Sequence, residues 1–449
     1  MSIDFLVDVF TENPGAEAVV WQGRVYSYRW LLNRLAHWRA ELAQQCIAPG
    51  SVVALEADFS PNAIALLLAL IERNCIVVPL TPSVEAKKPE FLEIAQAETV
   101  ITLDEADHAA VRRFSDAAQH SLYHQLRRLN HAGLVLFSSG STGKSKGIVH
   151  DFTRLLQKYR TRRHNLRTLT FLLFDHIGGV DTLFYSLSNG SCIVTVADRS
   201  PDAVCAAVEA HRVEVLPVSP TFLNLLILSE AYTRHNLSSL KYITYGAEVM
   251  PQAVLDRCVE LFPGVTVLQK YGTTEVGTLR SKSERSNSLW VKMGGDGFDI
   301  RVVDGMLQIK AQSAMLGYLN APNPFTEDGW FITGDEVQVK GEYLKILGRA
   351  SEIINVGGEK VYPAEVENVI QQMDNVADAT VFGRPSPITG SMVCANVRLL
   401  QPEEPKAFRR RLKVFCSERL QSYKVPVKVK IVRDDQHSSR FKKMRLNTV

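Results

Sequence analysis

Apolar residues between positions 50 and 104 gather in short runs that are separated by longer segments of helical character. The runs 52–55, 75–80 and 99–103 are rich in the β-branched residues that favour strands. Pro61 follows the first run and suits the first turn of a helix. Strands that alternate with helices in this way predict a parallel sheet covered by helices.

The same alternation returns later in the chain, where further strands are expected at 171–174, 192–196, 213–218, 240–244 and 265–268. From 289 to 347 short strands and turns predict a β-rich subdomain, and beyond 348 a small α+β unit follows. We therefore predict an α/β fold. Its large N-terminal domain (1–347) would hold two βαβ-type subdomains and the β-rich subdomain, and its small α+β C-terminal domain (348–449) would be mobile.

Composition and charge limit the number of folding units, the partners and the cellular compartment that are expected. A chain of 449 residues is expected to form two or three folding units, and a net charge of +3 gives no support for a nucleic-acid partner. The seven cysteines are widely spaced without a C-x-x-C pair, which argues against disulfides or structural zinc and favours a reducing compartment. The N-terminus lacks the pattern of a signal peptide, and the longest apolar run, 63–71, is too short to span a bilayer. A soluble, cytoplasmic protein is expected.

The segment 104–131 is polar and contains four histidines, at positions 108, 120, 124 and 131. Their spacing would allow a metal site, but no ordered carboxylates flank them. A solvated helix is the favoured interpretation.

The most distinctive segment is the loop 138–147, which is built almost entirely of Ser, Thr, Gly and Lys after an apolar strand-like run. Backbone N–H groups, hydroxyls and ammonium groups suit a polyphosphate. The P-loop pattern G-x-x-x-x-G-K-[ST] fits Gly143-Lys144-Ser145 but has Ser138 where its first glycine belongs. A second pattern, [ST]-S-G-[ST]-T-G-x-P-K-G, fits nine of ten positions, with Ser145 in place of proline. A flexible surface loop would also have this composition.

Downstream motifs decide between these interpretations. Tyr271-Gly272-Thr273-Thr274-Glu275 matches Y-G-x-T-E, and Trp330 to Asp335 matches W-[FY]-x-T-G-D. The run 348–367 matches G-R-x-x-[DE]-x-I-x-x-x-G-x-x-[IV]-x-P-x-E-[IV]-E. The segments 245–248 and 317–320 lie along the chain where further motifs of the same set are expected. Over nearly its whole length the chain resembles the adenylate-forming superfamily of acyl- and aryl-CoA synthetases, peptide-synthetase adenylation domains and luciferases.

The resemblance implies two half-reactions. A carboxylic acid attacks the α-phosphorus of ATP to give an acyl- or aryl-adenylate and pyrophosphate, and a thiol then takes the acyl group. Glu275 would bind Mg²⁺, Thr274 would contact the α-phosphate or the carboxylate, and Asp335 with Arg349 would hold the ribose. The remaining nucleotide-binding residues implied are Ser138, Ser139, Gly140, Ser141, Thr142, Gly143, Lys146, Gly246, Ala247, Glu248, Tyr271, Gly272 and Thr273.

The family also uses a lysine near the C-terminus, in the setting T-x-x-G-K-x-x-R. The register Ser438-x-x-Phe441-Lys442-x-x-Arg445 places Lys442 there, with Lys443 as the competing choice. In this family the C-terminal domain rotates between the half-reactions and brings in a loop that corresponds to Gly357 and Gly358 on the thiol-acceptor side. The hinge position is Ser351, where the family usually has Asp or Lys.

Substrate identity is less well defined. The acid pocket is expected to include Asp175, His176, Gly179 and Tyr245, with the glycines at 178 and 179 leaving space for the substrate. Asp175 would either grip an α-amino group or cap the following helix. An aryl or medium-chain acyl acid is favoured over an amino acid. The acceptor is CoA or the phosphopantetheine of a separate carrier protein.

Three functions stay open from the sequence. One is a ligase that makes an acyl- or aryl-thioester through an adenylate, and another is a free-standing amino-acid adenylation enzyme. The third is a catalytically degenerate nucleotide-binding member, which the departures at Ser145, Ser351 and Phe441 suggest.

Overall fold

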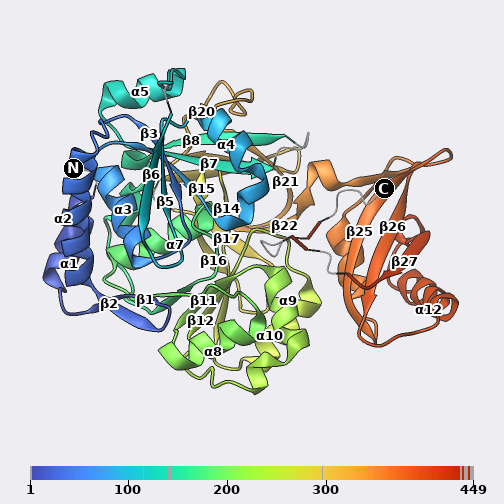
Figure 1. Cartoon of the computed structure of the whole chain (residues 1–449). Helices are drawn as coiled ribbons and strands as arrows, with labels where there is room; N and C mark the ends of the chain where they lie inside the picture. The colour runs from blue at the N-terminus through green and yellow to red at the C-terminus, as the bar shows by residue number, and fades with distance from the viewer. Residues whose placement is uncertain are drawn as a thin grey trace.

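The computed structural model describes residues 3–114, 116–139, 144–295, 297–434, 437–438 and 443–444, and only the backbone of Ser139. Its first sheet has seven strands, with parallel central strands and antiparallel strands at both edges (Figure 1). In spatial order these are β20 (Gly317–Tyr318), β8 (Ser145–Asp151), β7 (Gly133–Ser139), β4 (Ile76–Leu80), β3 (Val52–Glu56), β5 (Thr99–Leu103) and β6 (Ala109–Arg113).

The second sheet also has seven strands, and only its β1–β2 pair is antiparallel. The N-terminal hairpin joins this sheet because β1 pairs with β10 far along the chain. The spatial order is β13 (Thr266–Gln269), β12 (Tyr242–Tyr245), β11 (Val215–Val218), β9 (Thr168–Thr170), β10 (Ile193–Thr195), β1 (Glu17–Trp21) and β2 (Arg24–Ser27).

Helices α3 (Pro61–Glu72) and α7 (Ile177–Ser188) share one buried cluster with strands of both sheets. Ser60 caps α3 by accepting from the N–H of Ala63, and Pro61 takes the first helical position. Every residue from Pro61 to Ile71 is buried, so the apolar run is a core helix. The other helices of this part are α1 (Asp4–Glu12), α2 (Tyr28–Gln44), α4 (Lys88–Ala95), α5 (Ser121–Leu129), α6 (Phe152–Leu155), α8 (Pro201–His211), α9 (Pro220–Ser229) and α10 (Gln252–Leu261).

A third, antiparallel sheet follows the short hairpin of β14 (Gly272–Thr273) and β15 (Gly277–Thr278). It packs around a small apolar core of its own. Its order is β16 (Arg280–Ser283), β17 (Val291–Gly294), β22 (Tyr343–Arg349), β21 (Phe331–Lys340), β19 (Met306–Ala311) and β18 (Phe298–Val303).

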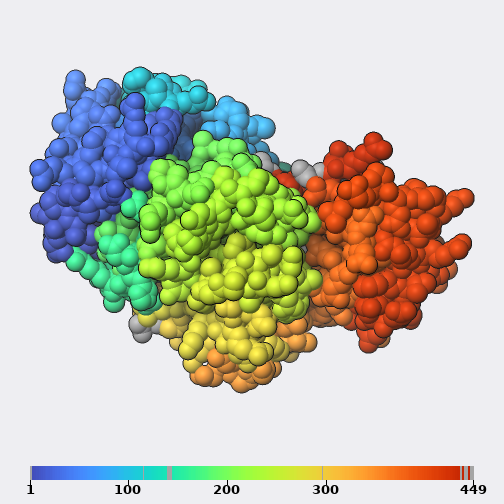
Figure 2. Space-filling view, turned by 90° about the horizontal axis from the view of Figure 1, so that it is seen from below, coloured from blue at the N-terminus to red at the C-terminus, as the bar shows by residue number. Residues whose placement is uncertain are grey.

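The C-terminal part forms a separate lobe, coloured orange to red in Figure 2. It contains β23 (Ile354–Val356), β24 (Glu359–Val361), α11 (Pro363–Ile370), β25 (Val376–Ser386), β26 (Gly390–Leu399), α12 (Pro405–Ser417) and β27 (Lys428–Val432). The Asn224 side chain donates to the Ala377 carbonyl at 3.1 Å, and the Ala253 N–H donates to Asn368 at 3.1 Å, which joins the lobe to α9 and α10. The predicted α/β fold, with a large N-terminal part and a small C-terminal part, is confirmed.

Two local predictions are wrong. Residues 171–174 form no strand, because β9 ends at Thr170; Phe171 packs against Phe222 in the core of the second sheet, and Phe174 packs in the core that contains α3 and α7. In the polar segment, 109–113 is the edge strand β6 rather than helix, while 121–129 is the helix α5. Within the described ranges, no three His, Cys, Asp or Glu side chains come together to form a metal site. Nor does any described helix have the length and apolar character that crossing a membrane requires.

Candidate active site

Strands β7 and β8 form the hairpin that carries the predicted phosphate loop. Ser138 lies opposite Lys146 and Ser139 opposite Ser145 in the antiparallel register. The loop between them, with Gly140, Ser141, Thr142 and Gly143, lies outside the described residues. The hairpin therefore places Lys146 beside the strand that leads into the loop.

The residue that departs from the family pattern, Ser145, uses an N–H that proline lacks. Its backbone N–H donates to the Glu90 carboxylate at 3.3 Å, and its carbonyl accepts from the Asn320 amide at 2.8 Å. Asn320 also accepts from the Gly147 N–H at 3.1 Å. The 317–320 motif thus holds the strand that leaves the phosphate loop, through β20 at the edge of β8.

Tyr318 of the same motif contacts both Lys146, which is predicted to bind phosphate, and Glu275, which is predicted to bind the metal. Its hydroxyl donates to Glu275 Oε1 at 2.9 Å, and Lys146 Nζ lies 5.1 Å from the centre of its ring. Burial and the neighbouring carboxylate raise the pKa of Tyr318, so the hydroxyl stays a donor. Sequence reasoning noted the motif but did not assign Tyr318 to the site.

His150 was also missed. Its ring is fully buried, and Nε2 lies 2.6 Å from the carbonyl oxygen of Thr274. Burial lowers the pKa of His150, so the neutral ring donates from Nε2. No local sequence pattern identifies His150, because its contact with Thr274 of the 271–275 motif forms only when the chain folds.

Asp335 forms a second centre with Tyr271 and Arg349. The Tyr271 hydroxyl donates to Asp335 Oδ2 at 2.5 Å, and Arg349 Nε lies 2.8 Å from Oδ1. Residues 335 and 349 are paired across β21 and β22, and Gly334 has a φ of +77° that favours glycine. Burial raises the pKa of Asp335, whereas the Arg349 charge acts in the opposite direction.

The segment 245–248 follows β12. Tyr245 is buried in the core of the second sheet, and a Cβ on Gly246 would lie 2.6 Å from the carbonyl oxygen of Lys270. Ala247 has a φ of +71°, an uncommon conformation for a residue with a side chain. Glu248 accepts from the Thr221 hydroxyl at 2.7 Å.

The predicted acid-pocket residues lie at the start of α7. The Asp175 carboxylate accepts from the Thr81 hydroxyl at 3.0 Å, and His176 caps the helix by accepting from the Gly178 N–H at 3.1 Å. The expectation that Asp175 caps the helix is therefore wrong. So is the expectation that glycines leave space here, because a Cβ on Gly179 would lie 1.9 Å from the Leu173 carbonyl oxygen.

Three of the predicted site residues follow β22 in the chain. Gly357 and Gly358 form the exposed turn between β23 and β24, where a Cβ added at either glycine would meet no described atom within 4 Å. Lys442 lies outside the described residues. The competing choice, Lys443, is described, and its ammonium donates to the Ala379 carbonyl at 2.7 Å and lies 3.0 Å from Asp378.

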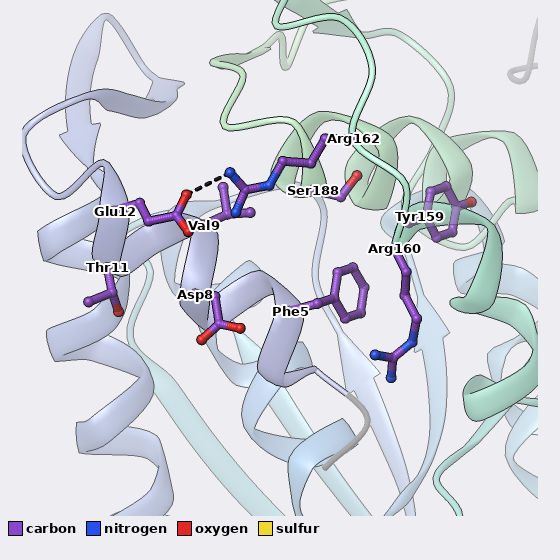
Figure 3. Close-up of a pocket in the computed structure, with 9 residues that line it drawn as sticks. All are labelled: Phe5, Asp8, Val9, Thr11, Glu12, Tyr159, Arg160, Arg162 and Ser188. Atoms are coloured by element: carbon purple, nitrogen blue, oxygen red, sulfur yellow. Dashed lines mark hydrogen bonds and ion pairs between the residues drawn. The ribbon is translucent and has the colours of Figure 1, made fainter.

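A surface pocket of about 380 Å³ lies elsewhere, between α1 and the segment 159–162 (Figure 3). Glu12 and Arg162 pair across it at 2.6 Å, and Arg160 covers the Phe5 ring. No predicted site residue lines this pocket, so it does not belong to the site.

The site thus brings together Lys146 and Glu275, which both contact Tyr318, and the Asp335–Arg349 pair, whose aspartate is affected by the Glu275 charge. This combination of charges suits a nucleotide, the ligand of the adenylate-forming class that the motifs indicate. The family description "AMP-binding enzyme" matches residues 7–304, and "AMP-binding enzyme C-terminal domain" matches 365–442. The chain belongs to the AMP-binding enzyme family, and the resemblance that the motifs indicate is confirmed.

Several relatives are CoA ligases. A 2-succinylbenzoate–CoA ligase of Enterococcus faecalis is 27% identical, over 93% of this chain and 92% of the relative. An indoleacetate–CoA ligase of Aromatoleum aromaticum is 27% identical, over 86% and 85%. A bicyclic propanoyl:CoA ligase of Rhodococcus jostii is 30% identical, but the match spans only 66% of this chain and 61% of that protein.

Solved structures show the same fold. An anthranilate CoA ligase in complex with anthranoyl-AMP has a TM-score of 0.82 at 18% identity, with 98% of this chain and 95% of the other covered. The o-succinylbenzoate CoA synthetase of Bacillus subtilis, in complex with its acyl-adenylate, has a TM-score of 0.78 at 21% identity, with 98% and 96% covered.

Proposed function

We propose that this chain activates a carboxylic acid with ATP, forming an acyl- or aryl-adenylate and pyrophosphate, and then transfers the acyl group to the thiol of CoA. The observation that carries the proposal is the position of Tyr318 between Lys146 and Glu275. Tyr318 thereby brings together the ammonium proposed to bind phosphate, which lies over its ring, and the carboxylate proposed to bind the metal, which accepts from its hydroxyl. A polyphosphate bound with a divalent cation needs both charges close together.

In the first half-reaction, a carboxylate oxygen forms a bond to the α-phosphorus and pyrophosphate leaves. Lys146 would offset negative charge on the leaving phosphates, and Thr274 would donate to the α-phosphate or the acid. His150 positions Thr274 through its carbonyl. Asp335 would accept from the ribose hydroxyls on lone pairs that Tyr271 and Arg349 leave, since a carboxylate offers about four acceptor sites.

Glu275 also suits magnesium. Mg²⁺ in nucleotide sites is typically bound by one or two carboxylates together with phosphate oxygens and waters. Oε1 of Glu275 accepts from Tyr318, and the carboxylate keeps further lone pairs with which it would hold the ion. When bound, the ion would neutralise charge on the phosphates.

We assign the terminal lysine to Lys442. Lys443 is a poor choice because its ammonium is already held by the Ala379 carbonyl and Asp378, inside the C-terminal lobe. For the second half-reaction, the lobe would rotate at Ser351, which lies in the exposed turn of residues 350–352 after β22. Rotation would bring the exposed turn at Gly357 and Gly358 towards the thiol.

CoA is the preferred acceptor because the relatives named above are CoA ligases. A phosphopantetheinyl carrier is the second choice. An amino-acid substrate is the third choice, because the relatives named above are CoA ligases. The Asp175 carboxylate accepts at Oδ2 from the Thr81 hydroxyl, and from the Thr81 backbone N–H at 3.4 Å.

ATP–pyrophosphate exchange across a panel of aryl, acyl and amino acids tests the proposal, followed by thioester formation with CoA or a carrier protein. Exchange should appear with aryl or acyl acids, and Glu275→Gln should reduce it by about 10²-fold or more. Tyr318→Phe keeps the ring beside Lys146 and should lose less. Exchange with no acid would support a degenerate nucleotide-binding member, and exchange with amino acids alone would overturn the assignment.

A further inference from the structure

Glu336 on β21 binds two side chains of the C-terminal lobe. Its Oε1 lies 2.6 Å from the Lys360 ammonium, and its Oε2 accepts a hydrogen bond from the Tyr362 hydroxyl. Glu336 precedes the proposed hinge at Ser351, whereas Lys360 and Tyr362 follow it in the chain. One carboxylate therefore bridges the large part and the lobe that is proposed to rotate.

The position of Glu336 connects this contact to the proposed nucleotide site. Its chain neighbour Asp335 is the residue proposed to hold the ribose, and successive residues of a strand point to opposite faces. Glu336 is paired with Gly348 across β21 and β22. A Cβ at Gly348 would lie 4.0 Å from Tyr362 Cδ1, so the tyrosine ring lies close to this glycine. The strand that carries Asp335 thus also carries an attachment point of the lobe.

The hydrogen bond from Tyr362 should contribute more than the ion pair with Lys360. The Glu336 side chain is 11% exposed and the Lys360 side chain 59% exposed, and exposed ion pairs contribute little. A hydrogen bond to a charged acceptor is about twice as strong as a neutral one. Burial, together with the hydrogen bond to Glu336, raises the pKa of Tyr362, so its hydroxyl stays a donor.

These contacts form in an arrangement of the lobe that suits the first half-reaction. In this arrangement the Lys443 N–H reaches Glu248, one of the predicted nucleotide-binding residues. The turn that is proposed to face the thiol later lies between β23 and β24, and Lys360 belongs to β24. A rotation that carries this turn towards the thiol would have to separate Lys360 and Tyr362 from Glu336.

We propose that Glu336 is a positioning residue that holds the C-terminal lobe in the arrangement of the first half-reaction, through Tyr362 and Lys360. The hold breaks when the lobe rotates for the second half-reaction. This inference rests on the proposed two-step function and identifies what retains the lobe before the second step. Glu336 takes no part in bond formation and acts only on the balance between the two arrangements.

The test measures two rates on each variant. One is ATP–pyrophosphate exchange with an acid that gives exchange in the panel above, and the other is CoA transfer from the synthetic adenylate of that acid. Tyr362→Phe combined with Lys360→Met should slow exchange and speed transfer. The ratio of transfer to exchange should rise by about 10-fold or more, because a hydrogen bond to a charged group contributes at least that factor. Tyr362→Phe alone should give most of the rise, and Lys360→Met little.

Tyr423→Phe combined with Lys424→Met is the matched control. The Tyr423 hydroxyl donates to Gln421 at 2.6 Å, and Lys424 lies 2.8 Å from Glu365, so both contacts stay within the C-terminal lobe. The control carries the same two substitutions as the test variant and should keep the wild-type ratio.

The ratio separates positioning from a merely structural role, because loss of stability would lower both rates alike. An unchanged or smaller ratio in the test variant, or an equal rise in the control, would overturn the inference while leaving the proposed function standing. Absence of exchange by the wild type with every acid would instead overturn the proposed function, and the inference with it. Melting temperatures show whether each variant folds, and Tyr362→Phe alone decides the question if the double variant does not.

Discussion

The backbone N–H of Lys443 donates a hydrogen bond to the Glu248 carboxylate, with 2.5 Å between N and Oε1. Glu248 lies in the large part, while the Lys443 ammonium is held by Asp378 of the C-terminal lobe. Lys443 is therefore a structural link between the two parts.

Substituting each lysine separately should distinguish a catalytic role of Lys442 from the structural role of Lys443. Lys442→Ala should strongly reduce adenylation yet leave thioester formation from preformed adenylate nearly intact, because only the first half-reaction needs its charge. Lys443→Ala should lower the melting temperature, because Asp378 and Glu367 lose their buried cation. Pyrophosphate exchange, CoA transfer from synthetic adenylate and thermal unfolding give the three readouts. Unchanged pyrophosphate exchange in Lys442→Ala would show that Lys442 is not the catalytic lysine.

His150 should make stability depend on pH. Burial lowers its pKa in the folded state, so the unfolded chain binds a proton that the folded chain does not. Its contribution is fully present above the unfolded pKa of about 6.5 and is lost as pH falls, at up to about 1.4 kcal/mol per pH unit.

Urea unfolding between pH 5.5 and 7.5 checks this, with His150→Gln as the variant because the amide nitrogen can still donate to Thr274. The variant should show a smaller loss of stability at low pH than the wild type. His211→Gln is a comparison, because the His211 pKa is also lowered by burial, at a partly exposed position on α8. Identical pH profiles for wild type and His150→Gln would contradict the prediction.

Ser145→Pro, which restores the usual family residue, should destabilise this chain. Proline has no N–H, so the Glu90 carboxylate would lose its donor at a cost of about 1–3 kcal/mol. Ser145→Ala keeps the N–H and should therefore cost less than the proline variant. Chemical unfolding of both variants measures the difference in stability. A proline variant as stable as the alanine variant would show that the hydrogen bond from Ser145 N–H to Glu90 contributes nothing.

The two neighbouring glycines of α7 should respond very differently to alanine. At Gly179 the added Cβ meets the Leu173 carbonyl oxygen at 1.9 Å, a backbone atom that cannot move alone. At Gly178 it meets the Leu172 side-chain methyl at 2.6 Å, which can rotate away. Gly179→Ala should cost about 3 kcal/mol or more, and Gly178→Ala about 1 kcal/mol or less. Comparable melting temperatures for both variants would refute the backbone explanation.

Local patterns in the sequence were enough to predict much of this structure. The β-branched runs at 52–55 and 99–103 became β3 and β5, and Pro61 begins α3 as expected. Local patterns failed where apolar residues are buried without pairing in a sheet. Residues 171–174 are the example, because they are mostly buried but belong to no strand.

Contacts across long sequence separations could not be predicted. Spacing along the chain does not show that His150 reaches Thr274 or that Asn320 reaches Ser145. The reason for glycine at 179 was likewise hidden, because a close backbone approach and an open pocket call for the same residue. The roles of the motif residues themselves, Glu275 and Asp335 among them, stay predictions that the experiments above test.

The placement of β1 has a consequence for how the chain emerges from the ribosome. Its parallel partner β10 begins at Ile193, so β1, which can pair with β2 at once, must wait for about 170 further residues before it can pair with β10. At ordinary rates of protein synthesis that delay is on the order of ten seconds. During this time the edge of β1 that later pairs with β10 is open, and the nascent chain is exposed to wrong pairing or to chaperone binding until the second sheet is completed.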